Sequence, residues 1–381
     1  MIALFWVCVG LILYTYFFYP VLIVVWALLF PRPSRVDESA LPHVSMLVAA
    51  YNEEDVIERK LQNCRELDYP ADRIEFLFGS DASSDRTPEI LNAGSSPQVR
   101  PFLFQERAGK ASVLNKIEPQ ATGVILVLSD ANTMYRSDAV RKLVRHFADS
   151  KVGGVCGRLE LADPSGSAGG QGGGLYWRYE NMLKASEGAV STVIGANGGI
   201  YAIRKELFRP VPTDRVLMDD FIIPLRAVEE GYRVVYEPEA VGTENMSPNM
   251  HGEFRREVRI AAANFNAFPY ILGLLNPFSG FASLALWSHK VLRWIVPFLA
   301  LAALSSNLLI VRRAWVYAAL LAVQALVYLG ALLGCAEDRL SSRRNVFAPF
   351  YYLVAMNLAL LLGFFRSLTR TQRAAWERVP H

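Results

Sequence analysis

The chain has 381 residues, of which 52% are apolar and 20% charged, and its mean hydropathy is +0.21. This composition excludes a disordered, collagen-like or disulfide-rich chain, and it is too apolar for one ordinary soluble domain. The 39 Lys and Arg residues against 36 Asp and Glu residues give a net charge of only +3, so we expect no nucleic-acid partner.

The first segment, from Ile2 to Phe30, carries no charge. As a helix it would be about 43 Å long, which exceeds the roughly 30 Å of a bilayer core. A cleaved signal peptide is the competing interpretation, but the segment lacks a basic start, and Pro31 and Arg32 follow it where a small-residue cleavage site would stand. We therefore predict that residues 1–30 form a transmembrane helix.

Residues 31–270 are predicted to form one domain in the cytoplasm. Apolar runs typical of buried strands alternate with helical patterns here, and the runs lie at 44–50, 74–78, 99–104 and 124–128. Such alternation predicts an α/β fold with a mostly parallel sheet, whose ligands bind beyond the carboxyl ends of the strands. The glycine-rich stretch 165–174 is expected to be a loop, either a mobile lid or a surface linker.

Acidic and amide side chains follow three of these strands. Tyr51 and Glu53 come after the first strand, Asp81 ends the second, and Asp130 and Asn132 follow the fourth. Each Asp taken singly is more often a turn former or a helix cap. Together they predict one crevice that holds a cation and a polar ligand.

Three further groups of charged residues in this domain are candidates for the site. Lys110 stands at the start of a predicted helix, where it is a candidate diphosphate contact or a solvated surface lysine. Asp219 and Asp220 are adjacent carboxylates in an apolar stretch, which suits a general base with a raised pKa or a helix cap. Arg256 and Arg259 share one helical face, where they clamp phosphates or extend toward anionic lipid.

Apolar stretches of near-spanning length return at 295–311, 314–334 and 346–365. We predict three transmembrane helices within 295–365, an interfacial helix region at 271–294 before them, and a basic tail at 366–381 after them. The basic flanks of the first two spans place the middle domain in the cytoplasm. We expect the membrane to be a bacterial inner (plasma) membrane. Three C-terminal spans would put the basic tail outside, against the same rule, so a re-entrant C-terminal segment is the alternative.

The motifs between residues 40 and 262, taken in order, resemble a membrane-bound family 2 glycosyltransferase of the cellulose-synthase-like and hyaluronan-synthase-like kind. The resemblance implies a GT-A fold, which is Rossmann-like, flanked by transmembrane helices. It implies a nucleotide sugar as the donor, in this family a UDP-sugar. It further implies that Tyr51, Glu53 and Asp81 hold the nucleobase and ribose, and that Lys110 holds the diphosphate.

Further roles follow from the same resemblance. Asp130 and Asn132 occupy the D-x-D position, where the family binds the nucleotide and Mg²⁺ or Mn²⁺. Asp220 stands where the family places its catalytic base. Asn197 belongs to a segment that resembles the acceptor-side loop, and Trp177 to the helix that lines the sugar pocket.

Two departures from the family pattern affect these expectations. Asn132 is neutral where the family has a second carboxylate, so we expect weaker metal binding or reliance on Asp130 and the diphosphate. Arg256 and Arg259 take the first and fourth positions of the Q-x-x-R-W motif, but Arg256 and Ile260 replace its Gln and Trp. The family associates that motif with processive synthesis.

The expected activity is inverting transfer of a sugar from a nucleotide-diphosphate sugar to a polysaccharide or lipid-linked acceptor, among membrane lipid at the cytoplasmic face. One alternative is a processive polysaccharide synthase with its own membrane channel. Another is a catalytically inactive scaffold that binds sugar nucleotides, which the neutral Asn132 makes conceivable.

Overall fold

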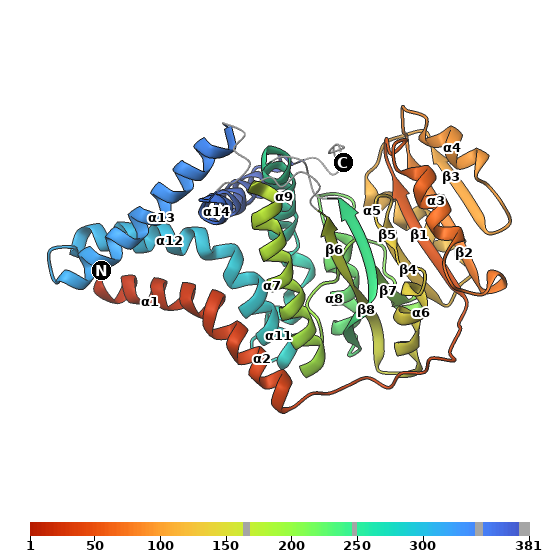
Figure 1. The fold of residues 1–381 in the computed structure, drawn as a ribbon. Helices are drawn as coiled ribbons and strands as arrows, with labels where there is room; N and C mark the ends of the chain where they lie inside the picture. Colours follow the sequence, from red (N-terminus) through yellow and green to blue (C-terminus); the bar gives the residue numbers. More distant parts are fainter. Residues whose placement is uncertain (163–167, 246–249, 340–345, 373–381) are drawn as a thin grey trace.

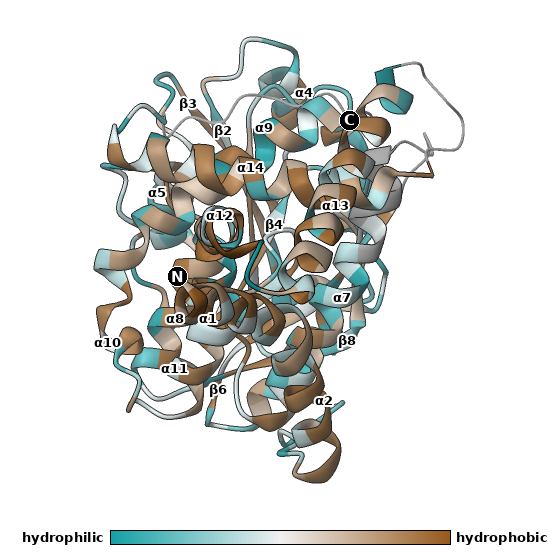
Figure 2. Cartoon of the chain, turned by 90° about the vertical axis from the view of Figure 1, so that its left-hand side faces the viewer, coloured by the Kyte–Doolittle hydropathy of each residue, from teal (hydrophilic) through white to brown (hydrophobic). Residues whose placement is uncertain are grey.

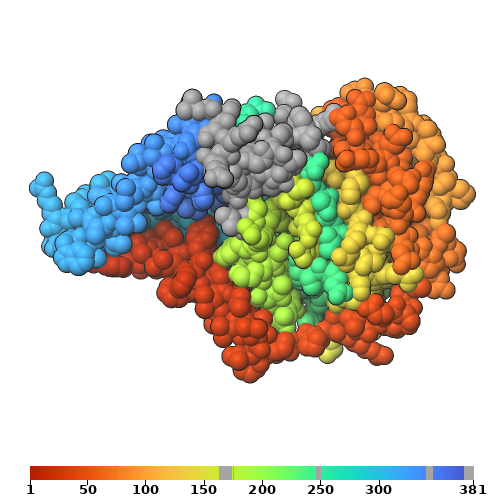
Figure 3. Space-filling view, viewed as in Figure 1, coloured from red at the N-terminus to blue at the C-terminus, as the bar shows by residue number. Residues whose placement is uncertain are grey.

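The computed structural model describes residues 1–162, 168–245, 250–339 and 346–372. A mixed α/β domain lies on one side of it, and long apolar helices from both ends of the chain lie on the other (Figure 1). Figure 3 shows the red and blue helices of the two chain ends projecting from the rounded domain.

An eight-stranded sheet forms the centre of the described domain, in the order β3-β2-β1-β4-β7-β6-β8-β5. In its first half β1 pairs in parallel with β2 and β4, and β2 pairs in parallel with β3. The carboxyl ends of these strands therefore meet at one edge. All four were predicted, and they span Val44–Ala50 (β1), Ile74–Asp81 (β2), Val99–Phe104 (β3) and Ile125–Asp130 (β4).

The second half of the sheet is mixed. β7 runs antiparallel to both β4 and β6, β5 runs antiparallel to β8, and β6 and β8 are parallel. Four of the seven strand pairings in the described residues are thus parallel, and the predicted α/β class is confirmed. These four strands, absent from the sequence prediction, span Met134–Tyr135 (β5), Val152–Ala162 (β6), Tyr201–Arg204 (β7) and Arg233–Asn245 (β8).

Successive residues of β1 face two different apolar cores. Met46 and Val48 pack into one, and Leu47 and Ala49 into the other. Every residue of the strand is buried, which is why it reads as an unbroken apolar run. Helices cover both faces: α3 (Ile57–Arg65), α4 (Thr87–Ala93) and α6 (Ala139–Val144) on one, α5 (Lys110–Ile117) and α8 (Asp219–Glu229) on the other.

Four helices of the described chain are long and apolar enough to cross a membrane, and they are brown in Figure 2. The first joins α1 (Ile2–Leu13) and α2 (Tyr19–Leu29) through a π-helical turn, and the second joins α11 (Phe281–Ala285) and α12 (Leu292–Ile310) in the same way. Their bounds are Ile2–Leu29, Phe281–Ile310, Trp315–Arg339 (α13) and Ala348–Leu368 (α14).

The second of these helices differs from the sequence prediction. Residues 271–294 were predicted as an interfacial region apart from the first C-terminal span, but Phe281–Ile310 is one continuous helix, and only α10 (Leu272–Leu275) stands apart. The polar residues His289 and Lys290 are accommodated inside this helix because both pair with Glu180 of a neighbouring helix.

That neighbouring helix is α7 (Ala168–Val190), and it corrects a second prediction. The glycine-rich stretch 165–174 was expected to be a loop, yet it is helical from Ala168 onward; residues 165–167 lie outside the described residues. Glycine lowers intrinsic helix propensity by about 1 kcal/mol per residue, but this segment continues into a long helix that packs on α2 and α14.

α14 lies across the direction of the other long apolar helices. Figure 1 looks almost along its axis while α12 and α13 run across the page, and Figure 2, turned by 90°, shows α14 running across the page. It packs along α9 (Met250–Asn266). Tyr352 clusters with Met250 at one end, and Ser367 Oγ donates to Asn266 Oδ1 at 2.7 Å at the other.

At Gly363, α14 approaches the backbone of α9 closely. A Cβ added there would lie 2.4 Å from Ala261 Cβ and 2.9 Å from the carbonyl oxygen of Val258. We expect Gly363→Ala to lower the free energy of unfolding by about 1–3 kcal/mol, the usual effect of overpacking. Thermal unfolding in detergent measures this, with Gly10→Ala as the control, because a Cβ at Gly10 has nothing within 4 Å. An unchanged midpoint for Gly363→Ala would mean that the helices can separate freely.

Candidate active site

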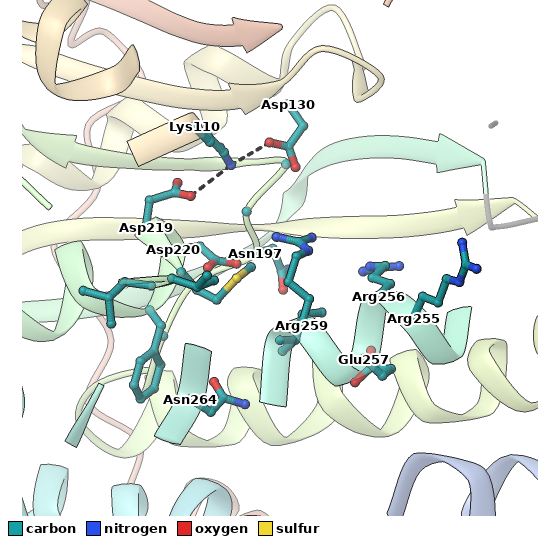
Figure 4. Close-up of a pocket in the computed structure, with 18 of the residues that line it drawn as sticks. Lys110, Asp130, Asn197, Asp219, Asp220, Arg255, Arg256, Glu257, Arg259 and Asn264 are labelled. Carbon is teal, nitrogen blue, oxygen red and sulfur yellow. Dashed lines mark ion pairs between the residues drawn. The ribbon is translucent and has the colours of Figure 1, made fainter. Parts of the chain in front are cut away.

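A cavity of about 1730 Å³ lies beyond the carboxyl ends of β1 and β4, between the sheet, α7, α9 and the apolar helices. Small-molecule sites usually measure about 300–1,000 Å³, so the cavity has room for more than one ligand. Residues predicted from distant parts of the sequence line it together, including Lys110, Asp130, Asp220 and Arg259 (Figure 4).

Lys110 is the first residue of α5, directly after Gly109, whose φ of 91° few other residues tolerate. Its Nζ lies 2.6 Å from Asp130 Oδ1 and 3.1 Å from Asp219 Oδ1 (Figure 4). Burial alone would lower the pKa of Lys110, but the surrounding carboxylates, with Asp130 first, outweigh burial and raise it. Lys110 is thus a fixed cation at the cavity wall.

Asp81 supports the loop before Lys110. Its two carboxylate oxygens accept the backbone N–H groups of Ala108 and Gly109, both at 2.8 Å, and its side chain is fully buried. The Arg107 guanidinium stacks 3.7 Å from the centre of the Tyr51 ring. In the described chain Asp81 and Tyr51 therefore lie beside the cavity and shape it, and their contacts with a nucleobase and ribose stay predictions.

Glu53 does line the cavity, although only 8% of it is exposed. Its backbone N–H donates to Thr87 Oγ1 at 2.8 Å, which ties the loop after β1 to the start of α4. Its predicted role as a ribose or nucleobase contact is therefore compatible with its position.

Asp130 and Asn132 both line the cavity at the end of β4. Burial would raise the pKa of Asp130, but Lys110 outweighs it and the net shift is downward, so Asp130 is ionised. In the part of the chain that the structure describes, no three His, Cys, Asp or Glu side chains are grouped to hold a metal. A carboxylate and an amide oxygen are hard donors that fit Mg²⁺ or Mn²⁺ only when phosphate oxygens or water complete the set.

Asp219 and Asp220 begin α8 and have different surroundings. The Asp219 carboxylate accepts the Tyr201 hydroxyl at 3.1 Å and pairs with Lys110. Among the described residues, no hydrogen bond or ion pair engages the Asp220 carboxylate. Burial, followed by the repulsion of Asp219, raises the pKa of Asp220 to about 6. Asp220 therefore has the properties of a general base at neutral pH.

Asn197 and Gly198 place the backbone against this carboxylate. A Cβ at Gly198 would lie 2.9 Å from Asp220 Oδ2, so the close approach requires glycine. The Asn197 amide donates to the carbonyl of Gly157 at 2.7 Å and accepts from Lys184 Nζ at 2.5 Å. Both ends of this amide are thus engaged within the protein, and Asn197 holds the loop; contact with an acceptor stays a prediction.

Lys184 of α7 is a functional candidate that sequence reasoning missed. It is buried, also donates to the carbonyl of Ala196 at 3.0 Å, and lowers the pKa of Asp220 by its charge. Its only sequence signal is a lysine in an otherwise ordinary helical pattern, which usually means a solvated face.

Removing the Lys184 charge gives a test of this arrangement. Lys184→Met leaves two acceptors without their donor, so we expect kcat to fall roughly tenfold. The acidic limb of the pH–rate profile should move to higher pH, because the pKa of Asp220 rises when a nearby cation is lost. Lys205→Met is the control, since Lys205 bonds to Ala121 outside the cavity. If the acidic limb of the pH–rate profile stayed in place in Lys184→Met, Lys184 would have no influence on Asp220.

α9 brings its arginines to the same cavity. Arg256 lies 3.5 Å from Glu253, while Arg259 points into the space beside Asp220 (Figure 4). In the described chain Arg259 has no hydrogen-bond or ion-pair partner. Burial, followed by the neighbouring Arg256 charge, lowers its pKa. A cation in this setting is suited to bind phosphate. Trp177 of α7 also lines the cavity, and its contact with the sugar stays a prediction.

Two further acidic groups belong to the lining. Glu244 of β8 bonds to Thr133, and burial, followed by the charge of Asp130, raises its pKa. Glu180 of α7 accepts from Lys290 at 2.6 Å and Arg293 at 2.9 Å, both on the second long apolar helix. Glu180 therefore joins the catalytic side of the molecule to that helix.

Comparison with known proteins agrees with this geometry. Residues 45–208 match the family described as Glycosyl transferase family 2. The probable glycosyltransferase YdaM of Bacillus subtilis is 28% identical over 249 residues, 60% of this chain and 57% of its own. A poly-β-1,6-N-acetyl-D-glucosamine synthase of Staphylococcus aureus is 30% identical over 238 residues, 60% of this chain and 55% of its own. The chain thus spans a little over half the length of these relatives.

One solved structure is similar over nearly its full length. The mannosyltransferase PcManGT from Pyrobaculum calidifontis, in complex with GDP-Man and Mn²⁺, superposes with a TM-score of 0.73 at 25% identity. The match covers 96% of this chain and 99% of that one. The similarity therefore includes the long apolar helices as well as the sheet.

Proposed function

We propose that this chain, which belongs to the family 2 glycosyltransferases with a GT-A fold, moves a sugar from a nucleotide-diphosphate donor to an acceptor hydroxyl with inversion at the anomeric carbon. The observation that carries the proposal is the half-buried Asp220 carboxylate, unpaired within the described chain, which shares one cavity with the cations Lys110 and Arg259. A base and two phosphate-binding cations are what this reaction needs.

In the proposed reaction the acceptor oxygen attacks the anomeric carbon. A new C–O bond forms, the bond to the diphosphate breaks, and its electron pair leaves with the diphosphate. Asp220 takes the acceptor's proton, while Lys110 and Arg259 stabilise the charge on the leaving group. A divalent cation held by Asp130 and Asn132 would supply further charge stabilisation there.

The donor and the acceptor are finer questions. A UDP-sugar is the family expectation, whereas the similar mannosyltransferase holds GDP-Man, so both nucleotides belong in the test. Relatives include a poly-N-acetylglucosamine synthase and, at 35% identity over 141 residues, a β-monoglucosyldiacylglycerol synthase of Trichormus variabilis. A polysaccharide and a lipid are therefore both candidate acceptors, at the cytoplasmic face that the basic flanks of the first span favour.

Two alternatives make different predictions. A processive synthase would release long polymer, but Arg256 and Ile260 replace the Gln and Trp of the motif that the family associates with processivity. An inactive scaffold would bind the nucleotide without turnover. The environment of Asp220, which is half-buried in a cavity with Lys110 and Arg259 and has a raised pKa, favours an enzyme.

Purified full-length protein in detergent provides the test. We expect nucleotide release from at least one UDP- or GDP-sugar when Mn²⁺ or Mg²⁺ and membrane lipid are present, and the length of the product separates single transfer from polymerisation. Binding without release in every combination would instead support the inactive scaffold.

The pH dependence of turnover tests the base directly. Because the pKa of Asp220 is raised to about 6, the carboxylate is ionised above this pH and protonated below it. We expect kcat to fall about tenfold for each pH unit below 6, with nucleotide affinity much less affected. A profile that is flat from pH 7 to pH 5 would be inconsistent with Asp220 as the base.

A further inference from the structure

We propose that α14 lies in the plane of the cytoplasmic membrane surface as a roof over the catalytic cavity, and that the acceptor is a membrane lipid with a free hydroxyl that reaches Asp220 past this helix. The second part rests on the proposed glycosyltransferase activity. α14 is long and apolar enough to span a bilayer, so its placement has to be argued from its surroundings.

Both ends of α14 line the cavity that holds Asp130 and Asp220. Pro349 contributes at the start of the helix, and Arg366 contributes near its end. A helix of 21 residues is about 31 Å long, close to the thickness of the bilayer core. If α14 crossed the bilayer, one of its ends would lie on the far side from the cavity, which the shared lining excludes.

The neighbouring helices give the direction of the membrane. Phe5, Ile310 and Tyr317 form an apolar cluster at the tip farthest from the sheet, where α12 ends and α13 begins (Figure 1). The chain therefore leaves the domain along α12 and returns along α13. α14 then begins on the domain side and lies across these helices, against α9.

Charge agrees with this arrangement. With three crossings instead of four, Arg366 and Arg370 lie on the same side as Arg255 and Arg256 of α9. Basic residues next to membrane helices gather on the cytoplasmic side. The conflict that four crossings create for the basic tail is then removed.

α14 gives the cavity an apolar wall toward the bilayer. Leu353, Met356 and Leu360 contribute to the lining, and Tyr16 joins them from the first long helix. Leu353 is 43% exposed, so this wall offers an accessible apolar surface. An apolar chain can lie along this wall while a polar head group reaches Asp220.

The base identifies the head group. An alcohol does not ionise at neutral pH and needs a base as it attacks, whereas a phosphate monoester, with a second pKa of about 6, is already an anion. Asp220, placed in the cavity with a carboxylate that no described residue engages, suits the alcohol. A lipid with a free hydroxyl, such as a diacylglycerol or a glycolipid, is therefore the acceptor class.

Cysteine labelling in cells tests the placement of α14. Arg370→Cys and, as the matched control, Arg312→Cys in the α12–α13 connection are each introduced in a Cys335→Ser background, because the other native cysteines are buried. A membrane-impermeant maleimide should label Arg312→Cys in intact cells, and Arg370→Cys only in inside-out vesicles. Labelling of Arg370→Cys in intact cells would overturn the in-plane arrangement.

Reconstitution tests the acceptor. Full-length protein in vesicles made from the total lipid of the expression host is given radiolabelled donor sugar. We expect label in a chloroform-soluble product that survives mild acid, as a glycoside does. A mild-acid-labile lipid would indicate a phosphate acceptor, and water-soluble or insoluble polymer would indicate a glycan; either result overturns the proposal. No nucleotide release in any arm would instead refute the glycosyltransferase activity itself.

A pair of substitutions on α14 tests whether this helix contributes to binding of the lipid acceptor. Met356→Trp narrows the apolar wall, whereas Leu358→Trp is the matched control, since Leu358 is 50% exposed and outside the lining. We expect Met356→Trp to reduce the lipid product at least tenfold with nucleotide affinity retained, and Leu358→Trp to resemble the native protein. Equal amounts of lipid product from the two variants would mean that the acceptor does not pass along α14.

Discussion

Asp220→Asn is expected to lower kcat by at least about a hundredfold, because general-base catalysis is worth about 10² to 10⁴ in rate. The amide keeps the size of the side chain but cannot accept the acceptor's proton. Nucleotide affinity should stay nearly normal, since Lys110 pairs with Asp130 and Asp219 rather than with Asp220. Single-turnover kinetics measure the loss of turnover, and a direct titration with the nucleotide measures its affinity separately.

The neighbouring carboxylate provides the contrast. Asp219 is paired with Lys110 and bonded to Tyr201, so Asp219→Asn should chiefly raise KM by loosening the phosphate-binding lysine. Near-normal turnover of Asp220→Asn, or a larger loss of kcat in Asp219→Asn, would mean that Asp220 is not the base.

Asp130→Ala is expected to abolish metal-dependent nucleotide binding. Asp130 is the ionised carboxylate at the D-x-D position, and its removal leaves Asn132 as a neutral donor too weak to hold Mg²⁺ or Mn²⁺ by itself. Titration of the nucleotide with and without Mn²⁺ measures the loss without reference to turnover.

The reverse substitution serves as the companion of Asp130→Ala. Asn132→Asp restores a second carboxylate and should strengthen the effect of Mn²⁺ on nucleotide affinity, because divalent cations favour charged oxygen ligands. If Mn²⁺ raised nucleotide affinity equally in native protein and in Asp130→Ala, the metal would lie elsewhere.

The parallel half of the sheet could be predicted because its strands are buried on both faces. A strand such as β1 has no polar face, so its apolar run stands out from the polar loops around it. Because the strand ends of a parallel sheet meet at one edge, the sequence predicted that Glu53 and Asp130 share one crevice, and both line the cavity.

The missed residues belong to elements whose pattern is ambiguous. Glu244 lies at the end of β8 between two exposed residues, Thr243 and Asn245, and Lys184 lies on a helix where a lysine normally indicates solvent. Local polarity alone therefore predicted that these side chains lie at the protein surface, whereas both line the cavity.

The apolar helices show another limit of sequence reasoning. Length and hydropathy identify segments that can cross a bilayer, but they do not tell whether the helix axis runs across the membrane or along it. The placement of α14 depends on contacts distant in sequence, above all the approach of Gly363 to α9 and the bond between Ser367 and Asn266.

A structure of the full-length protein with Mn²⁺ and an unreactive sugar-nucleotide analogue would test the whole account at once. We predict the diphosphate beside Lys110 and Arg259, with the anomeric carbon facing the Asp220 carboxylate and the open space beyond it leading toward α14. A nucleotide bound outside this cavity, or a sugar turned away from Asp220, would contradict the account.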